Sequence, residues 1–129
     1  MIAIDTNILA RYIVEPDGEE GALASQLLED RLSQDDPGFV SADVVAELLW
    51  VLGVRYSVSH DQQRAIVEKL LEMPQLIVEN SDAIEKALAS SHRGLADCIV
   101  HEIGQAAGCR HTATFDKRFA RMKQVELVK

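Results

Sequence analysis

The chain opens with the stretch MIAIDTNIL (residues 1–9), in which a carboxylate interrupts an apolar run. The apolar residues at 2–4 have the pattern of a short buried strand, and Asp5 follows them directly. Apolar residues then resume in TNILARYIV (residues 6–14) at the spacing of a helix. This order predicts a strand that ends at Asp5 and a helix that begins immediately after it.

The same switch between strand-like and helix-like patterns repeats along the chain. Further short strands are predicted within residues 39–41, 75–79, 110–115 and 125–128. Further helices are predicted over residues 17–32, 41–54, 80–91, 95–108 and 116–122, and from Ser59, with a capping box to Gln62, as far as Pro74. Strands that alternate with helices predict parallel β-α-β units, hence an α/β fold with a helix-covered sheet.

Size and composition indicate a globular protein. A length of 129 residues predicts one domain, residues 1–129, and 47% hydrophobic against 26% charged residues suits a buried core. No run approaches the roughly 18 apolar residues of a membrane helix, and the first charge is Asp5 rather than the basic residues of a signal peptide. We therefore expect a cytoplasmic protein with no membrane contact, in which Cys98 and Cys109 are buried, reduced thiols.

The net charge of −8 argues against a nucleic-acid partner, because nucleic-acid-binding proteins usually carry basic patches. An acidic chain can still bind phosphates if its carboxylates surround divalent cations, since those cations reverse the local field. The position of the acidic residues therefore matters more than their number.

Glu47 is the acidic residue whose position is most unusual. It lies three residues after Val44, four before Val51 and next to Leu48, which places it on the apolar stripe of its predicted helix. A carboxylate on such a stripe is costly unless it is paired or binds a cation. An ion pair with an arginine is the alternative, but the only basic residue of this helix, Arg55, is eight positions away.

Three further acids occupy related positions. Asp5 and Asp116 each follow a predicted strand and precede a helical pattern, and Asp97 lies in the first turn of a helix. Each has an ordinary explanation alone, as a helix N-cap or as an acid that complements the helix dipole. In a parallel sheet, however, ligands bind beyond the carboxyl ends of the strands, where these acids are expected to meet.

Four convergent carboxylates would repel one another strongly. At a separation of about 4 Å, two of them repel by about 4 kcal/mol at an effective dielectric constant of about 20. Such a cluster either takes up protons or holds a hard cation such as Mg²⁺ or Mn²⁺, which prefers oxygen ligands. An acidic Mg²⁺ pocket at a sheet edge is suited to phosphoryl chemistry.

The segments around these acids resemble those of PIN-domain ribonucleases, specifically VapC-type toxins of toxin–antitoxin pairs. The similar segments are AIDTNILARYI around Asp5, SADVVAELLWVL around Glu47, GLADCIV around Asp97 and TATFDKRFAR around Asp116. No single segment is diagnostic, but all four occur in the family order. The resemblance implies a PIN-like fold, with a central parallel sheet of about five strands flanked by helices on both faces.

The resemblance also implies an activity and partners. It predicts a cytoplasmic homodimer that cleaves RNA with Mg²⁺ or Mn²⁺, held and used catalytically by Asp5, Glu47, Asp97 and Asp116, and a cognate antitoxin protein. The class of RNA stays open. Family members often carry a further aspartate three residues before the third acid, where this chain has Gly94, so one metal ion or two remain alternatives.

Supporting roles fall to residues near the acids. Thr6 and Thr114 are candidates to orient a carboxylate, although β-branched residues also favour strand ends. Candidate phosphate contacts are Arg11, Arg93, Lys117 and Arg118. Trp50 with Leu49 and Leu52 gives one helix more apolar surface than a single face needs, which suits a homodimer, although Trp50 itself is expected in the core.

Three other functions compete with this one. A PIN fold that binds without cleaving is the first. A Mg²⁺-dependent phosphatase with Asp5 as nucleophile is the second, but such sites usually carry an acid where Asn7 stands. A receiver-like domain is the third, but no aspartate follows residues 75–79 closely enough. The HEIGQ segment lacks the second histidine of a zinc protease.

Overall fold

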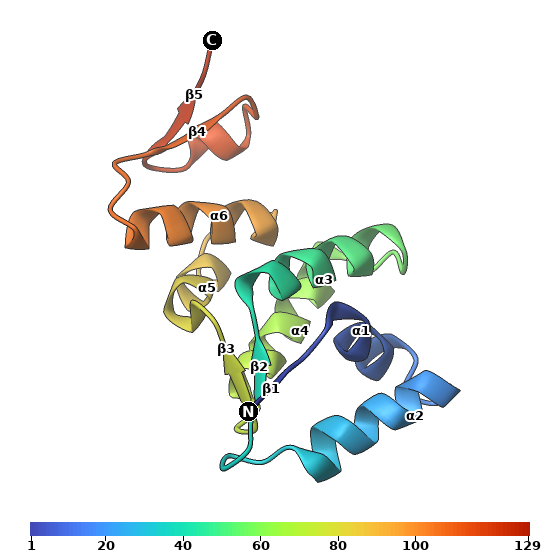
Figure 1. Ribbon diagram of the computed structural model, residues 1–129. Helices are drawn as coiled ribbons and strands as arrows, with labels where there is room; N and C mark the ends of the chain where they lie inside the picture. The colour runs from blue at the N-terminus through green and yellow to red at the C-terminus, as the bar shows by residue number, and fades with distance from the viewer. The chain divides into compact units, whose positions relative to one another are not determined.

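The computed structural model describes residues 1–129. They form two compact units, residues 1–79 and residues 80–129 (Figure 1). Each unit has its own helices, its own parallel strands and its own buried residues. The expected single domain over residues 1–129 stays a prediction.

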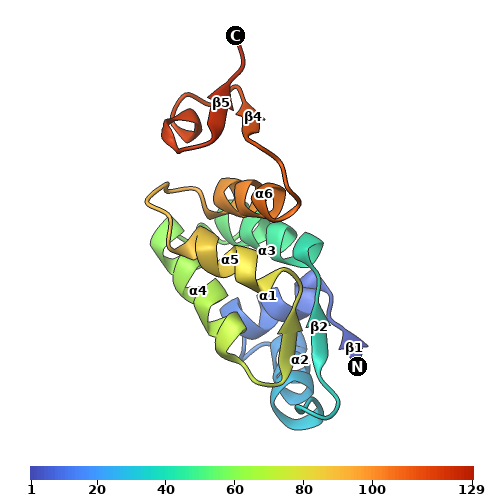
Figure 2. The same cartoon turned by 90° about the vertical axis from the view of Figure 1, so that its left-hand side faces the viewer.

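The first unit contains a three-stranded parallel sheet in the order β1-β2-β3. Figure 2 shows β1 and β2 side by side. Their parallel pairing places Ile2 opposite Gly38. In chain order its elements are β1 (Ile2–Ala3), α1 (Thr6–Val14), α2 (Glu19–Ser25), a π-helical turn η1 (Gln26–Arg31), β2 (Gly38–Val40), α3 (Ala42–Val54), α4 (His60–Glu72) and β3 (Leu76–Val78). Helix α1 packs against α2 and α3, and α4 packs against α3 and β3.

Several helices of the first unit begin where the sequence predicts, because N-capping side chains precede them. The Ser59 side chain accepts the backbone N–H of Gln62, and the Gln62 side chain accepts the N–H of Ser59, which confirms the capping box. Ser41 caps α3 by accepting the N–H of Val44. The predicted helix over residues 17–32 is present as α2 and η1, because the ladder widens from α-helical to π-helical bonds at Gln26.

The second unit contains two helices and a pair of parallel strands. Its elements are α5 (Ser81–Leu88), α6 (Leu95–Ala106), β4 (Thr112–Thr114), a 3₁₀ turn η2 (Phe119–Arg121) and β5 (Val125–Leu127). Helix α5 packs against α6, and Thr112 lies opposite Val125 in the strand pair. Gly108 follows the end of α6 with φ +94°, a conformation that favours glycine and that agrees with the expected helix stop.

The α/β class and the parallel pairing of the strands are confirmed. All five expected strands are present, distributed over a three-stranded and a two-stranded sheet. The predicted helix over residues 116–122 is wrong in length, because only residues 119–121 form a 3₁₀ turn before the left-handed residue Gln124 leads into β5. No helix combines the length and the apolar character needed to span a membrane.

Candidate active site: two pairs of carboxylates

Asp5 and Glu47 are brought together in the first unit by Thr6. Asp5 follows β1 and caps α1, and its Oδ1 accepts the backbone N–H of Thr6 at 2.9 Å. Thr6 is only 2% exposed, and its Oγ1 donates to Oε2 of Glu47 at 3.0 Å. The hydroxyl is available for this bond because α1 packs against α3. The capping role expected of Asp5 and its place beside a second acid are therefore compatible.

Glu47 does not lie on the buried face of its helix. Leu48 and Val51 are buried, whereas Glu47 is exposed within its unit, so its expected position on the buried stripe is wrong. Helix α3 is apolar nearly all round, and Glu47 lies outside its buried face. The buried residues of α3 are Val45, Leu48, Leu49, Val51 and Leu52. Its hydrogen-bond partner within the unit is Thr6, and no Lys or Arg of the unit forms an ion pair with it.

Asp97 contacts a histidine in the second unit. It lies in the first turn of α6, as expected, and its Oδ2 is 3.1 Å from Nε2 of His92. The His92 side chain is 12% exposed, against 46% for Asp97. No periodic pattern predicts this contact, because His92 precedes the helix in an irregular segment.

Asp116 is held by backbone groups. It follows β4, its own N–H donates to Oγ1 of Thr114 at 3.0 Å, and its Oδ1 accepts the N–H groups of Arg118 at 2.8 Å and Phe119 at 3.2 Å. These bonds, that from Phe119 most of all and then that from Arg118, lower the pKa of Asp116 below its ordinary value. Asp116 is therefore ionised at neutral pH, and a positive charge on His92 acts in the same direction.

Phe119 links the surroundings of Asp97 and Asp116. Its ring stacks on His92, with centroids 5.2 Å apart and an interplanar angle of 27°. The ring of His101 meets it edge-on at 6.4 Å, and Nδ1 of His101 lies 2.7 Å from Oγ1 of Thr112. One buried aromatic side chain thus supports the histidine that contacts Asp97, while its backbone N–H binds Asp116.

Arginines line a cavity of about 300 Å³ in the second unit. Arg93 and Arg118, both predicted phosphate contacts, lie in its wall. His92 and Arg121 lie there too, although neither was predicted as a site residue. None of the three arginines forms an ion pair within the unit. Lys117 is exposed and is not part of this wall.

Arg11 has a different environment from the other predicted phosphate contacts. It forms an ion pair with Glu15, and its guanidinium also donates to the hydroxyl of Tyr56 at 3.3 Å. Hydrogen bonding to Glu15, with the charge of Glu15, raises the pKa of Arg11. A phosphate would have to compete with this pair, so Arg11 is the weakest of the four candidates.

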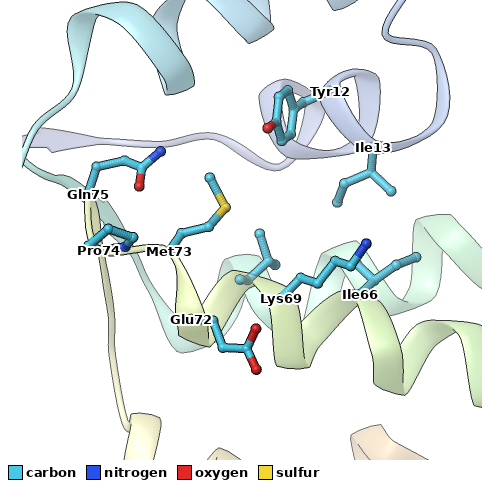
Figure 3. Close-up of a pocket in the computed structure, with 9 residues that line it drawn as sticks. Tyr12, Ile13, Ile66, Lys69, Glu72, Met73, Pro74 and Gln75 are labelled. Carbon is cyan, nitrogen blue, oxygen red and sulfur yellow. The ribbon is translucent and has the colours of Figure 1, made fainter.

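A separate cavity of about 620 Å³ lies between α1 and the end of α4. Figure 3 shows Tyr12 and Ile13 on one side and Ile66, Lys69 and Met73 on the other. None of the predicted site residues lines this cavity. Burial, and then a hydrogen bond donated to Glu29, raises the pKa of Tyr12 beside it.

The chemistry of the carboxylates fits a hard divalent cation. The Asp5–Glu47 pair belongs to the first unit and the Asp97–Asp116 pair to the second, so the convergence of all four stays a prediction. Within either unit, no group of three or more His, Cys, Asp or Glu side chains is placed to hold a metal ion. Each unit nevertheless offers exposed carboxylate oxygens, which are the ligands that Mg²⁺ and Mn²⁺ prefer.

Comparison with known proteins adds one finding. A family model described as PIN domain matches residues 2–125, which is nearly the whole chain. The comparison with curated proteins gave no match.

Proposed function

The chain belongs to the PIN domain family, and we propose that it is a Mg²⁺- or Mn²⁺-dependent endoribonuclease, the toxin component of a toxin–antitoxin pair. One observation carries this proposal beyond the family match. In the first unit Thr6 bonds both Asp5 and Glu47, acids that are far apart in the sequence. In the second unit His92 contacts Asp97, and two backbone N–H groups bind Asp116.

The residues proposed to hold the cation are Asp5, Glu47, Asp97 and Asp116. A divalent cation at such a site supplies a nucleophile at neutral pH and neutralises charge on the scissile phosphate and the leaving oxygen. Thr6 keeps Glu47 in one orientation through its hydroxyl, and Thr114 holds the backbone of Asp116. The N–H groups of Arg118 and Phe119 keep Asp116 ionised, which a cation ligand requires.

RNA is proposed to bind through its phosphates. The guanidinium groups of Arg93, Arg118 and Arg121 line one cavity, and an arginine binds phosphate through two parallel N–H bonds. Lys117 and Arg11 are proposed as weaker contacts. Such contacts position the strand without reading its sequence, so transfer, ribosomal and messenger RNA all remain candidate substrates.

The nuclease proposal is tested by incubating the protein with structured and unstructured RNA at neutral pH. We expect cleavage with Mg²⁺ or Mn²⁺, none with EDTA, and products that carry a 5′-phosphate and a 3′-hydroxyl. Asp97→Asn should abolish the activity. A protein that binds Mn²⁺ but cleaves no RNA would favour the alternative, a PIN fold retained for binding, and phosphate release from small esters would favour the phosphatase.

The toxin role includes a cytoplasmic location and a cognate antitoxin. We propose that an apolar antitoxin segment lies against the first unit and that an arginine of the antitoxin binds the carboxylates in place of the cation. We propose that this segment lies beside residues 47–52 of α3; the cavity of Figure 3 is elsewhere in the unit, between α1 and α4. A partner encoded by a neighbouring gene should bind the wild type more tightly than a variant with Asp5, Asp97 and Asp116 changed to Asn.

The proposal also includes a homodimer. Leu49 and Leu52 are core residues, which corrects their assignment to an outer apolar surface, and Trp50 is 64% exposed, which corrects its expected burial. Trp50 and the exposed Val54 therefore provide the apolar surface of α3 for a second copy. Light scattering at micromolar concentration should give twice the mass of the chain, and a monomer would refute the dimer.

A further inference from the structure

His92 and Asp97 form a contact that differs from an ordinary surface pair. Nε2 of His92 lies 3.1 Å from Oδ2 of Asp97. An ionised carboxylate only accepts hydrogen bonds, so an ionised Asp97 requires Nε2 of His92 to be the donor in this contact. Oδ2 is thereby engaged, and no other hydrogen bond within the unit involves Oδ1 of Asp97.

The position of the His92 ring is determined by several contacts. The ring stacks on Phe119 at 5.2 Å. The backbone N–H of His92 donates to Oγ of Ser90 at 3.2 Å, and its carbonyl accepts the thiol of the buried Cys98 at 3.7 Å. These contacts hold both the ring and its backbone, so the direction of Nε2 is set before any ligand binds.

Gly94 leaves the space that this contact occupies. A Cβ atom at residue 94 would lie 3.1 Å from Oδ2 of Asp97 and 3.4 Å from Nε2 of His92. The first of these distances is tighter than an ordinary van der Waals contact. Any side chain at residue 94 would therefore enter the space between the two partners. This is the position at which the chain departs from the further aspartate expected three residues before Asp97.

We propose that His92 is a positioning residue for Asp97, because its N–H holds Oδ2 and leaves Oδ1 available as a cation ligand. The inference rests on the proposed metal-dependent function. His92 makes this contact in the space that the absence of a side chain at residue 94 leaves open. Groups that orient a metal ligand in this way typically change metal affinity or activity by about 10–100-fold.

The chain offers a matched control. Nε2 of His111 lies 2.6 Å from a carboxylate oxygen of Glu126, also in the second unit. This pair is more exposed, 37% and 61%, and no ring contact holds His111. Removing His111 should therefore leave metal binding unchanged, although it also breaks a histidine–carboxylate pair.

The first measurement uses the metal-free protein and needs no change at His92. Nitrogen-15 spectra in alkaline buffer, where a histidine ring carries one proton, should place that proton on Nε2 of His92. Asp97→Ala should shift this resonance and leave that of His111 unchanged. A proton on Nδ1, or a His92 resonance that is insensitive to Asp97→Ala, would overturn the inference whether or not the protein binds metal.

The second measurement is the Mn²⁺ affinity by calorimetry. We expect His92→Ala to weaken binding about 10-fold, His92→Gln, which keeps an N–H donor, to restore most of the affinity, and His111→Ala to match the wild type. If His92→Ala bound Mn²⁺ as tightly as the wild type, the inference would be overturned. It would also be overturned if His92→Gln had the wild-type melting temperature but bound Mn²⁺ as weakly as His92→Ala. If the wild type neither bound Mn²⁺ nor cleaved RNA, the proposed function would be overturned. The nitrogen-15 spectra would still decide whether the N–H of His92 holds Asp97.

Discussion

The two units differ sharply in charge. Residues 80–129 hold eight of the 13 Lys and Arg but only six of the 21 acidic residues, a net charge of +2, whereas residues 1–79 carry −10. The total of −8 therefore conceals a basic region, and the objection it raised to a nucleic-acid partner applies only to the first unit. Three of the eight basic residues of the second unit line one cavity. A net charge is an average, and phosphate recognition depends on local clusters.

The units also differ in how they support their acids. In the first unit Thr6 joins two acids that are far apart in the sequence, because its backbone N–H donates to Asp5 and its buried hydroxyl donates to Glu47. In the second unit backbone N–H groups hold Asp116, and a histidine contacts Asp97. A backbone N–H group remains when its residue is substituted, whereas the hydroxyl of Thr6 is lost when Thr6 is replaced by a residue without one. The first pair should accordingly be the more sensitive to a single conservative change.

The largest expected effect tests whether the two units are equally necessary for cleavage. Asp5→Asn and Asp97→Asn should each reduce RNA cleavage by more than the roughly 100-fold upper range of a merely supporting group, because each removes a proposed cation ligand. The measurement is the initial rate of RNA cleavage with Mg²⁺. Asp43→Asn and Asp82→Asn are matched controls, since both acids lie exposed in the first turn of a helix.

Asp5→Asn also allows a test of crowding among the acids. In metal-free buffer its denaturation midpoint should equal or exceed that of the wild type, because three clustered charges repel less than four. Normal cleavage by Asp5→Asn would remove residue 5 from the proposed site. Loss of cleavage in only one of the two Asn variants would show that one unit suffices for catalysis.

A smaller effect is expected at Thr6. Thr6→Val keeps the side-chain shape but removes the donor to Glu47, and we expect about a 10-fold loss of cleavage. The free energy of unfolding, measured in urea, should fall by about 1 kcal/mol. Thr6→Ser keeps the hydroxyl and should keep most of the activity. If the Val and Ser variants lose activity equally, packing rather than the hydrogen bond explains the role of Thr6.

A still smaller effect is expected in the arginine cavity. Arg121→Gln should raise KM for RNA without a matching loss of kcat, since it removes a contact that positions the strand. The slope of log binding affinity against log salt should become shallower by about 0.7, the value for one phosphate contact on a single strand. Arg110→Gln, in the same unit but outside the cavity, is the control. Identical slopes for the two variants would contradict a phosphate site at Arg121.

The smallest effect concerns pH and Asp116. Because its pKa is lowered in the folded protein, its ionised form contributes stability above the ordinary aspartate pKa, and this contribution disappears as pH falls through the lower folded value. The wild type should therefore melt slightly above Asp116→Asn at pH 7, and the difference should shrink as the pH is lowered through the ordinary aspartate pKa and below it. Asp116 is fully exposed, so we expect a small difference. A difference that persists in acid would exclude the charge as its cause.

Short-range features were predictable from the sequence. A capping box needs residues three apart, and a strand or helix start needs a local pattern, so Ser59, Ser41 and Asp5 were assigned correctly. Trp50 was placed wrongly because α3 is apolar nearly all round, and periodicity cannot rank the faces of such a helix. The buried residues Val45, Leu48, Leu49 and Leu52 occupy the inward positions and leave Trp50 outside.

The missed residues of the second unit share one property. His92, Phe119 and Arg121 act through contacts between an irregular segment and a turn, which no periodic pattern encodes. The available signal was indirect. Gly94 departs from the acid expected at that position, and the structure now shows which atoms fill the space.

The two cysteines have a practical consequence for the redox handling of the protein. Cys98 is buried as expected, whereas Cys109, which was also expected to be buried, is an exposed free thiol just beyond α6. In air, thiolates at Cys109 of two copies can oxidise to a disulfide and produce a covalent dimer with no native interface. Such a species would have the mass of the proposed homodimer. Mass measurements therefore require a reductant or Cys109→Ser, whose retained dimer would be non-covalent.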